Sequence, residues 1–224
     1  MAMKRRYLIG ILVAAIVVAT GLLGAGALVV GQSKVPPQAI ASSVTRTPEL
    51  VERAWRLPVA ATFDRQLTWQ SNGSRCGPAS VANAYRSLGE AASTEDKVLA
   101  GTGQCWTGLY ILGLTLDELA DVARTNTSRK ITVLRDLSEE EFRAHLRRSN
   151  DPGRRYIVNF SRERIFGAGV GHHSPIGGYL EPEDLVFVLD VNQDYQPWLI
   201  ESKRLFAAAN TLDGNKKRGL LLIE

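Results

Sequence analysis

The sequence predicts an α+β fold in which a helical N-terminal half packs on an antiparallel β C-terminal half. Helix-start signals dominate up to residue 141, whereas the short apolar runs from Tyr156 onward are bounded by Gly, Pro, Asp or Asn, as strands are. Helices followed by strands, rather than alternating with them, indicate an α+β domain. Residues 47–224 supply enough chain for one such domain and its core.

The sequence of the first half contains three helix-start signals. Thr47-Pro48-Glu49 is a capping residue followed by proline at the first helical position. Both "TLDE" (115–118) and "SEEE" (138–141) fit the capping box. Apolar residues at helical spacing follow each start, so we expect three helices here.

Four extended segments follow in the second half. They are "YIVNF" (156–160), "VGHHSPIGGYL" (170–180), "LVFVLD" (185–190) and "GLLLIE" (219–224). Each is short, apolar and flanked by turn-forming residues, which is typical of strands.

The first 31 residues predict a membrane anchor or a signal segment. Tyr7 to Val30 is a run of 24 residues without charge, and a helix of that length measures about 36 Å, enough to cross a bilayer core of about 30 Å. The small residues 24–27 offer the alternative of a cleaved signal peptide. With Lys4, Arg5 and Arg6 held in the cytoplasm, we expect a bacterial inner-membrane protein with its domain in the periplasm, or a periplasmic protein after cleavage.

The remainder is divided into a linker over residues 32–46 and a catalytic domain over 47–224. Pro36-Pro37 and small polar residues favour a tether in the first of these ranges. Residues 1–34 contain four of the 27 lysine and arginine residues and no aspartate or glutamate. Residues 35–224 therefore contain 23 basic and 23 acidic residues and have no net charge. We therefore expect no nucleic-acid partner, because such proteins carry a clustered basic face.

Cys76 is the first candidate for chemistry. It precedes Gly77-Pro78 and "ASVANAYRSL" (79–88), whose apolar residues form one helical stripe. Because proline is tolerated only in the first turn, Cys76 should lie at the N-terminus of a buried helix, where the dipole favours a thiolate. The dipole contributes only about 0.3–1 kcal/mol, less than one pKa unit at about 1.36 kcal/mol, so a second positive group is needed.

A histidine could supply that charge, and the sequence has three. His145 lies in a charged helix and is expected at the surface. His172 and His173 are adjacent in a predicted strand, where neighbouring side chains face opposite sides, so only one should meet Cys76. A structural buried histidine is the alternative. Asp190 ends a strand and could orient the imidazole, and the order Cys, His, Asp matches papain-like cysteine peptidases.

Longer stretches carry a more specific resemblance. "CGPAS", "GLTLDELA", "FGAGVGHHSPIGGY", "LVFVLDVNQDYQPW" and "LFAAANTLDGNKKRGLLLI" resemble the phytochelatin synthase family, a branch of the papain-like clan, from about Thr47 to Glu224. The resemblance implies a papain-like fold and a γ-glutamylcysteinyltransferase acting on glutathione, with Cys76, His172 and Asp190 as the triad. His172 is chosen because the family pattern is Gly-His-Phe-Ser-Pro, so that His173 replaces the phenylalanine.

Further roles are implied by the same resemblance. Gln70 occupies the position of the family's oxyanion-hole glutamine, and Arg218 matches the family's arginine before the last strand, where it could bind a substrate carboxylate. Asn159, at the end of "YIVN", and Gly171 are further candidates for substrate binding. A structural turn or strand-end role is the alternative for Arg218 and Asn159. The implied partners are glutathione and its metal thiolates, with the membrane reached through the N-terminal segment. The oligomeric state is left open, with a homodimer as one alternative.

The reaction implied is cleavage of the Cys-Gly bond of glutathione through a thioester on Cys76. The γ-glutamylcysteinyl group then passes to water or to a second glutathione, the latter being phytochelatin synthesis. The family usually has an arginine and a lysine after the aspartate, where this sequence has Asn192, Gln193 and Asp194. If those bases hold the second glutathione, we expect hydrolysis to exceed chain extension.

No protein-bound metal or other cofactor is expected. Cys76 and Cys105 are the only thiols, which fits a short bacterial type without the plant members' cysteine-rich C-terminal region. Heavy-metal ions such as cadmium or zinc would enter as glutathione thiolates. We expect Cys105 to be a small buried residue near Trp106, with a disulfide to Cys76 as the alternative.

Two other functions stay open at this point. A papain-like peptidase acting on another small or γ-glutamyl peptide would share the triad. A membrane-tethered binding module with an inactive site would share only the fold.

Overall fold

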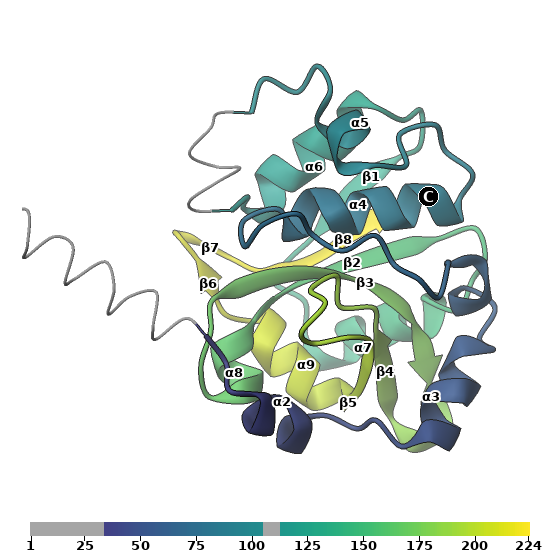
Figure 1. Cartoon of the computed structure of the whole chain (residues 1–224), viewed down its shortest axis with the longest axis vertical. Helices are drawn as coiled ribbons and strands as arrows, with labels where there is room; N and C mark the ends of the chain where they lie inside the picture. Colours follow the sequence, from purple (N-terminus) through teal and green to yellow (C-terminus); the bar gives the residue numbers. More distant parts are fainter. Residues whose placement is uncertain (1–33, 105–112) are drawn as a thin grey trace, which may run out of the picture.

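The computed structural model describes residues 34–104 and 113–224, which fold around one antiparallel sheet (Figure 1). Its strand order is β1-β8-β2-β3-β4-β5. The strands are β1 (Ile131–Leu134), β2 (Arg155–Ser161), β3 (Gly171–Leu180), β4 (Leu185–Val188), β5 (Trp198–Glu201) and β8 (Gly219–Ile223), with a separate hairpin of β6 (Leu212–Asp213) and β7 (Lys216–Lys217). The α+β prediction is confirmed.

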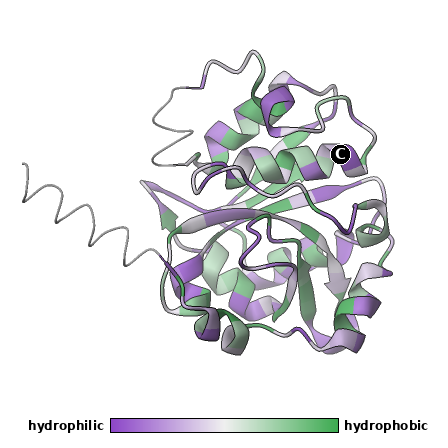
Figure 2. Ribbon diagram, viewed as in Figure 1, coloured by the Kyte–Doolittle hydropathy of each residue, from purple (hydrophilic) through white to green (hydrophobic). Residues whose placement is uncertain are grey.

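Helices cover both faces of the sheet (Figure 1). One face carries α3 (Pro48–Trp55), α4 (Cys76–Ser87), α5 (Glu95–Leu99) and α6 (Leu116–Thr125). The opposite face carries α2 (Pro37–Ser43), α7 (Glu139–Arg148), α8 (Arg162–Phe166) and α9 (Ser202–Ala209). In Figure 2, β4 is hydrophobic along its length, whereas α4 and β3 combine hydrophobic and polar residues.

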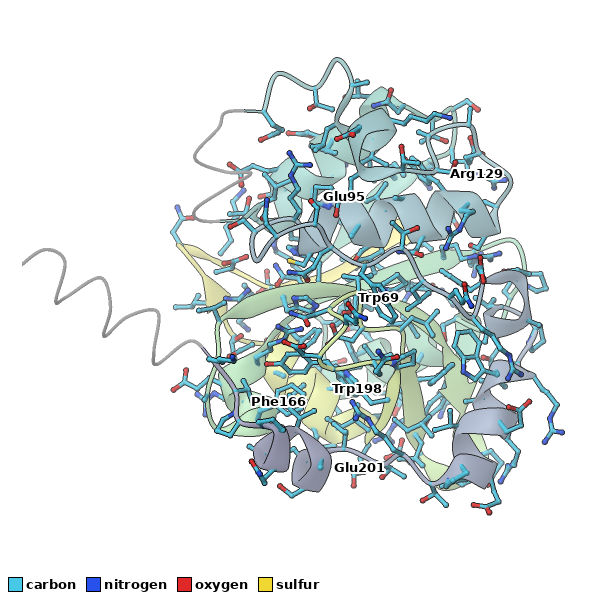
Figure 3. The ribbon with its side chains drawn as sticks, viewed as in Figure 1. Trp69, Glu95, Arg129, Phe166, Trp198 and Glu201 are labelled. Carbon is cyan, nitrogen blue, oxygen red and sulfur yellow. The ribbon has the colours of Figure 1, made fainter. Side chains whose placement is uncertain are left out.

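The alternation of side chains along β2 builds both cores. Tyr156, Val158 and Phe160 join the cluster beneath α7, α8 and α9, while Ile157 joins the cluster beneath α4 and α6. Because both faces are buried, three apolar residues follow one another at positions 156–158. The strand's polar residues Arg155 and Asn159 are buried as well, and each has hydrogen-bond partners, Ser87 for Arg155 and Asp213 for Asn159. Side chains fill the layers on either side of the sheet (Figure 3).

The predicted starts and strands are largely confirmed. Capping boxes form at Thr115 and Ser138, and α3 begins at Pro48, although the Thr47 side chain makes no capping hydrogen bond. The four predicted extended segments correspond, in chain order, to strands β2, β3, β4 and β8. Strand β1 was not predicted, and it pairs with the C-terminal β8, so the first half also contributes to the sheet.

The linker prediction over 32–46 needs correction for its described part. Residues Pro37–Ser43 form α2, and Val35 and Ile40 are each only 4% exposed. The backbone of Thr45 exchanges hydrogen bonds of 2.8 and 3.0 Å with Leu199. Buried apolar side chains and paired backbone groups hold this segment on the domain, which therefore begins near Val35.

The predicted anchor or signal segment over residues 1–31 lies outside the described residues. Across 34–104 and 113–224, no helix is both long and apolar enough to span a bilayer. Cys105 and Trp106 also lie outside the described residues.

Candidate active site

Helix α4 begins at Cys76, as the sequence predicts, and carries the candidate nucleophile at its first position. All ten residues from Cys76 to Tyr85 are buried. Gly77 lets this end approach α6 closely, because a methyl group there would lie 2.9 Å from Leu119 Cδ1. Ser80 Oγ donates to the carbonyl oxygens of Cys76 and His173, at 2.7 and 3.0 Å, and so ties the helix start to β3.

The Cys76 thiol is only 5% exposed, and its Sγ lies 3.8 Å from Nδ1 of His173. Burial raises the pKa of this thiol, but the positive charge of His172, a hydrogen bond with that ring and a smaller contribution from His173 outweigh it. The net pKa of Cys76 is well below its usual value. A thiolate is therefore favoured, as a nucleophile requires.

His172 links the thiol to Asp190. Its Nε2 lies 2.9 Å from Asp190 Oδ1, and its ring packs edge-on against Phe160 with centroids 5.6 Å apart. Burial and the charge of Arg162 lower the pKa of His172, but Asp190 and the Cys76 thiolate raise it further, so the net pKa is raised. The ring is thus suited to hold the thiol proton.

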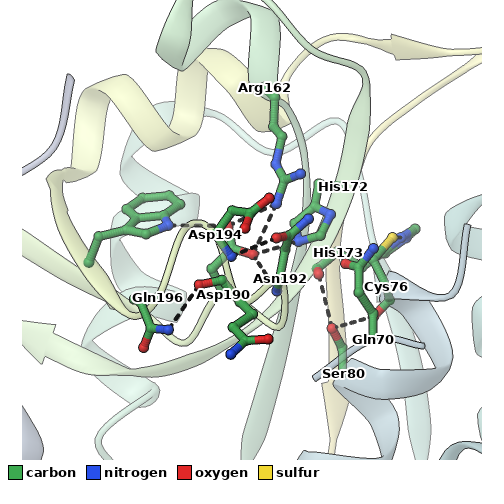
Figure 4. A network of polar contacts seen from close by, with 12 residues as sticks. Gln70, Cys76, Ser80, Arg162, His172, His173, Asp190, Asn192, Asp194 and Gln196 are labelled. Atoms are coloured by element: carbon green, nitrogen blue, oxygen red, sulfur yellow. Dashed lines mark hydrogen bonds and ion pairs between the residues drawn. The ribbon is translucent and has the colours of Figure 1, made fainter. Parts of the chain in front are cut away.

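The expectation that only one of the two histidines meets Cys76 is wrong. The strand register does place the rings on opposite faces, His172 opposite Phe160 and His173 opposite Asn159. However, His172 is the second residue of β3, and at this end of the strand the thiol is within reach of both rings. Figure 4 shows the two rings next to Cys76.

Asp190 is fully buried and receives several donors. Arg162 Nη2 lies 3.0 and 3.1 Å from its two oxygens, Trp198 Nε1 donates to Oδ2 at 3.2 Å, and the Asn192 N–H donates to Oδ1 at 2.9 Å. Burial raises the pKa of Asp190, but Arg162 and His172 lower it more strongly, so the net pKa falls below its usual range. Asp190 is therefore ionised and fixed in place.

Arg162 was missed by the sequence reading. It is the first residue of the short helix α8, is 7% exposed, and its guanidinium lies 3.6 Å from the ring centroid of Tyr195. Its position directly after "YIVNFS", ten residues before His172, was the available signal. That signal is weak, because nothing local distinguishes Arg162 from the exposed Arg164.

Gln70 lies beside the thiol in Figure 4. Its backbone N–H donates to Val191 O at 2.9 Å, and its Nε2 donates to Asn72 O at 2.7 Å. An amide nitrogen has two hydrogens, so one N–H of Gln70 remains for a substrate. The N–H of Cys76 belongs to the first turn of α4, where backbone donors lack intrahelical partners.

A buried carboxylate holds the loop between Gln70 and Cys76. Glu95, 7% exposed, accepts from the N–H and Oγ of Ser71 at 2.9 and 2.5 Å, and from Arg75 Nη1 at 3.4 Å. The sequence reading did not find Glu95, because its contacts are with residues 20 and 24 positions away.

The three residues predicted to bind substrate also lie together. Arg218 Nη1 donates to Asn159 Oδ1 at 2.8 Å, and the added Cβ of any other residue at Gly171 would collide with the Arg218 guanidinium. Asp213 pairs with both, accepting from Asn159 Nδ2 at 2.9 Å and lying 3.3 Å from Arg218 Nη2. The third histidine, His145, is partly buried and contacts Tyr156 at 3.1 Å, away from this cluster.

A pocket of about 380 Å³ opens beside this cluster. Arg218 and Gly171 line it, together with Arg164, Val170 and Leu212. Burial lowers the pKa of Arg218, while the nearby charges of Asp213 and Cys76 raise it. Cys76 does not line this pocket, but its charge acts on Arg218, which does.

A family model described as phytochelatin synthase matches residues 30–220. The chain belongs to the phytochelatin synthase family. A stretch of 117 residues is 30% identical to the glutathione gamma-glutamylcysteinyltransferase of Schizosaccharomyces pombe (strain 972 / ATCC 24843), and covers 50% of this chain and 28% of that protein. A stretch of 121 residues is 31% identical to glutathione gamma-glutamylcysteinyltransferase 3 of Lotus japonicus, covering 51% and 25%.

The phytochelatin synthase relatives are thus matched over about a quarter of their own length. Among solved structures, the peptidase domain of Streptococcus ComA, a bi-functional ABC transporter involved in quorum sensing, is similar with a TM-score of 0.49 and 14% identity. That match covers 71% of this chain and 96% of the domain.

Proposed function

We propose that this protein is a thiol-dependent acyltransferase that cleaves the Cys-Gly bond of glutathione through a γ-glutamylcysteinyl thioester. One observation carries the proposal: in a member of the phytochelatin synthase family, a buried thiol of lowered pKa meets a histidine that Asp190 holds at 2.9 Å. Nucleophilic catalysis by cysteine needs these three roles in contact.

Acylation follows from the positions of these groups. The Cys76 thiolate attacks the carbonyl carbon between the cysteine and glycine of glutathione, and negative charge develops on the carbonyl oxygen. The free N–H of Gln70 and the N–H of Cys76 stabilise that charge. His172 then gives its proton to the departing glycine amine, and a thioester remains on Cys76.

Deacylation reverses the proton transfers. His172, now neutral, takes a proton from the incoming nucleophile, which attacks the thioester and releases the Cys76 thiolate. Water as the nucleophile yields γ-glutamylcysteine, and the amine of a second glutathione yields a longer peptide. Asn192, Gln193 and Asp194 offer no positive charge to hold a second glutathione after Asp190, so we expect hydrolysis to exceed chain extension.

The γ-glutamyl end of the substrate carries a carboxylate and an ammonium group. Arg218, whose pKa responds to the charge of Cys76, forms a pair of opposite charges with Asp213. Such a pair is complementary to a zwitterion. Arg218 would bind the carboxylate, and Asp213 the ammonium group. Asn159 keeps the pair in place through hydrogen bonds to both side chains.

A side chain at Gly171 would collide with the Arg218 guanidinium and displace it from the position proposed for binding the substrate carboxylate. Gly171 therefore acts by leaving room for the guanidinium on the pocket side of β3. Heavy-metal ions, bound as glutathione thiolates, would enter with the substrate. Across residues 34–104 and 113–224 no group of three His, Cys, Asp or Glu side chains could hold a metal ion of its own.

The test is glycine release from glutathione by the full chain, with and without cadmium, with all products resolved by mass. We expect glycine and γ-glutamylcysteine as the main products, and their loss in Cys76→Ser. Cys105→Ser is the matched control and should retain activity. An active Cys76→Ser variant would refute the proposal, whereas products dominated by (γ-Glu-Cys)n-Gly peptides would refute only the preference for water.

A further inference from the structure

A second imidazole touches the candidate nucleophile, and the triad does not use it. His173 is 3% exposed, and its Nδ1 lies 3.8 Å from Cys76 Sγ. It projects from β3 toward α4, opposite Asn159 in the strand register, whereas His172 faces Phe160 and Asp190. The two rings therefore approach the sulfur from different sides.

The environment of the His173 ring indicates where its proton lies. Nε2 is buried and has no hydrogen-bond partner among the described residues. A neutral imidazole carries its hydrogen on one nitrogen only, and a buried N–H without an acceptor is unfavourable because its hydrogen bond to water is lost and not replaced. The hydrogen therefore belongs on Nδ1, which faces the sulfur, and a bare lone pair is left at Nε2.

We propose that His173 is a second catalytic residue, whose Nδ1–H donates a hydrogen bond to the sulfur of Cys76. His172 accepts the thiol proton and passes it on, while His173 keeps its own proton throughout. The donor stabilises the thiolate before it attacks. It acts again at deacylation, when the C–S bond breaks and the sulfur leaves as a thiolate.

This role is separate from that of the residues around it. The other charged and titratable groups that act on Cys76 are His172 from β3 and Arg218 before β8, while Asp190 after β4 and Arg162 from α8 act on His172. Among the described residues, neither Arg162 nor Arg218 donates a hydrogen bond to Sγ, and His172 is bound through its Nε2 to Asp190. His173 is thus the group that can be changed without breaking the His172–Asp190 pair.

The inference rests on the proposed function only in taking Cys76 as the nucleophile, so its test avoids glutathione. The full chain carrying Cys105→Ser, in which Cys76 is the only thiol, is alkylated with iodoacetamide across a range of pH, and the rate is followed by intact mass. The variants His173→Phe, His173→Asn and His173→Gln are compared in this background. Failure to turn over glutathione would leave this readout unaffected.

His173→Phe removes the donor, so the midpoint of the alkylation profile should rise by about one pH unit or more, since hydrogen bonds to charged groups are the stronger ones. At a pH below the midpoint, alkylation should slow by about tenfold. The side-chain nitrogen of Asn can replace Nδ1, so His173→Asn should keep the profile of the parent. That of Gln reaches the Nε2 position instead, so His173→Gln should resemble His173→Phe.

Thermal unfolding by circular dichroism first establishes that each variant is folded. If His173→Phe is not folded, the Asn and Gln variants decide the same question with polar side chains. A folded His173→Phe whose profile overlays that of the parent would overturn the proposal. So would identical profiles for the Asn and Gln variants, because a donor role depends on the position of the N–H.

Discussion

The Nε2 atom of His172 lies 2.9 Å from Oδ1 of Asp190, and neither side chain is more than 2% exposed. Because Nε2 is engaged with the carboxylate, the other ring nitrogen is the one left to exchange protons with a substrate or with Cys76. Three further donors, from Arg162, Trp198 and Asn192, hold the carboxylate itself. The imidazole is therefore oriented through a chain of buried contacts.

The first prediction concerns this orientation. Asp190→Asn presents an amide where His172 needs an acceptor, and should lower kcat by about 10³–10⁴ because the imidazole takes the wrong tautomer. It also leaves Arg162 without its carboxylate, so we expect a loss of about 3–5 kcal/mol in the free energy of unfolding. Glycine release and urea unfolding measure the two effects.

The control is Asp194→Asn, an exposed carboxylate in the same loop. It should change neither quantity much, since exposed charges contribute little. Activity in Asp190→Asn within tenfold of the parent would contradict the assigned role of Asp190.

The second prediction concerns Arg162 and pH. The folded pKa of Asp190 is lowered, so its ionisation stabilises the protein above the unfolded pKa of about 3.9, and this contribution is lost as pH falls through the folded pKa. Arg162→Met removes a cation that lowers that pKa. The folded pKa of Asp190 should rise, and acid destabilisation should begin at a higher pH.

Thermal midpoints recorded on acidification of both proteins test this shift. Arg164→Met is the matched control, because Arg164 is exposed in the same short helix and no ion pair joins it to another described residue. If the parent and Arg162→Met lose stability over the same pH range, then Arg162 does not set the ionisation of Asp190.

Much of the triad could be predicted, because each member follows a local signal. Gly-Pro after Cys76 predicts a helix start, and the apolar run before Asp190 predicts a strand end. Arg162 and Glu95 carry no such signal: their roles come from contacts with residues 28 and 24 positions away, which the strand register and loop packing create. The contact between Cys76 and His173 was not predicted, because the rule that neighbouring strand residues face opposite sides does not consider the end of a strand. At the end of β3 the thiol can reach the side chains of both faces.

Contacts with residues distant in sequence also explain why the linker prediction over residues 32–46 failed. Pro36-Pro37 is a good signal for an extended tether, but the proline also suits the first turn of a helix. Burial of Val35 and Ile40 against the far side of the sheet decided between the two. Val35 and Ile40 pack against side chains that come mainly from residues 142–222. The sequence of the first 46 residues therefore cannot by itself predict this burial.

The third prediction concerns the loop that carries Gln70. Glu95 binds Ser71 next to Gln70, and Arg75 next to Cys76, so Glu95→Gln should loosen the position of the oxyanion donor. We expect kcat to fall by about 10–100-fold, with KM and the alkylation profile of Cys76 nearly unchanged. Gln70→Ala alone should cost about 10²–10³ in kcat.

A double-mutant cycle separates positioning from general damage. In the Gln70→Ala background, Glu95→Gln should have little further effect, because the donor it positions is gone. Asp96→Asn is the control, since Asp96 is 92% exposed and lies 3.6 Å from the same Arg75. Equal penalties for Glu95→Gln in both backgrounds would contradict a role through Gln70.

The fourth prediction concerns the packing of the first turn of α4, which carries Cys76. Gly77 lies in the first turn of α4, and Leu119, against which an added methyl group would press at 2.9 Å, is fully buried in α6. Alanine gains about 0.5–1 kcal/mol over glycine inside a helix, but overpacking a filled core costs about 1–3 kcal/mol. We expect the cost to dominate, so Gly77→Ala should lower the free energy of unfolding by about 1 kcal/mol.

Gly73→Ala is the matched substitution, because a methyl group there meets nothing within 4 Å. It should leave stability nearly unchanged. Chemical denaturation of both variants measures the difference, and alkylation of Cys76 in Gly77→Ala reports whether the helix start has moved from His172. Since the thiolate depends on that contact, a shifted helix should slow alkylation near neutral pH. A Gly77→Ala protein with unchanged stability and normal alkylation would contradict this prediction and show that Leu119 on α6 moves aside instead.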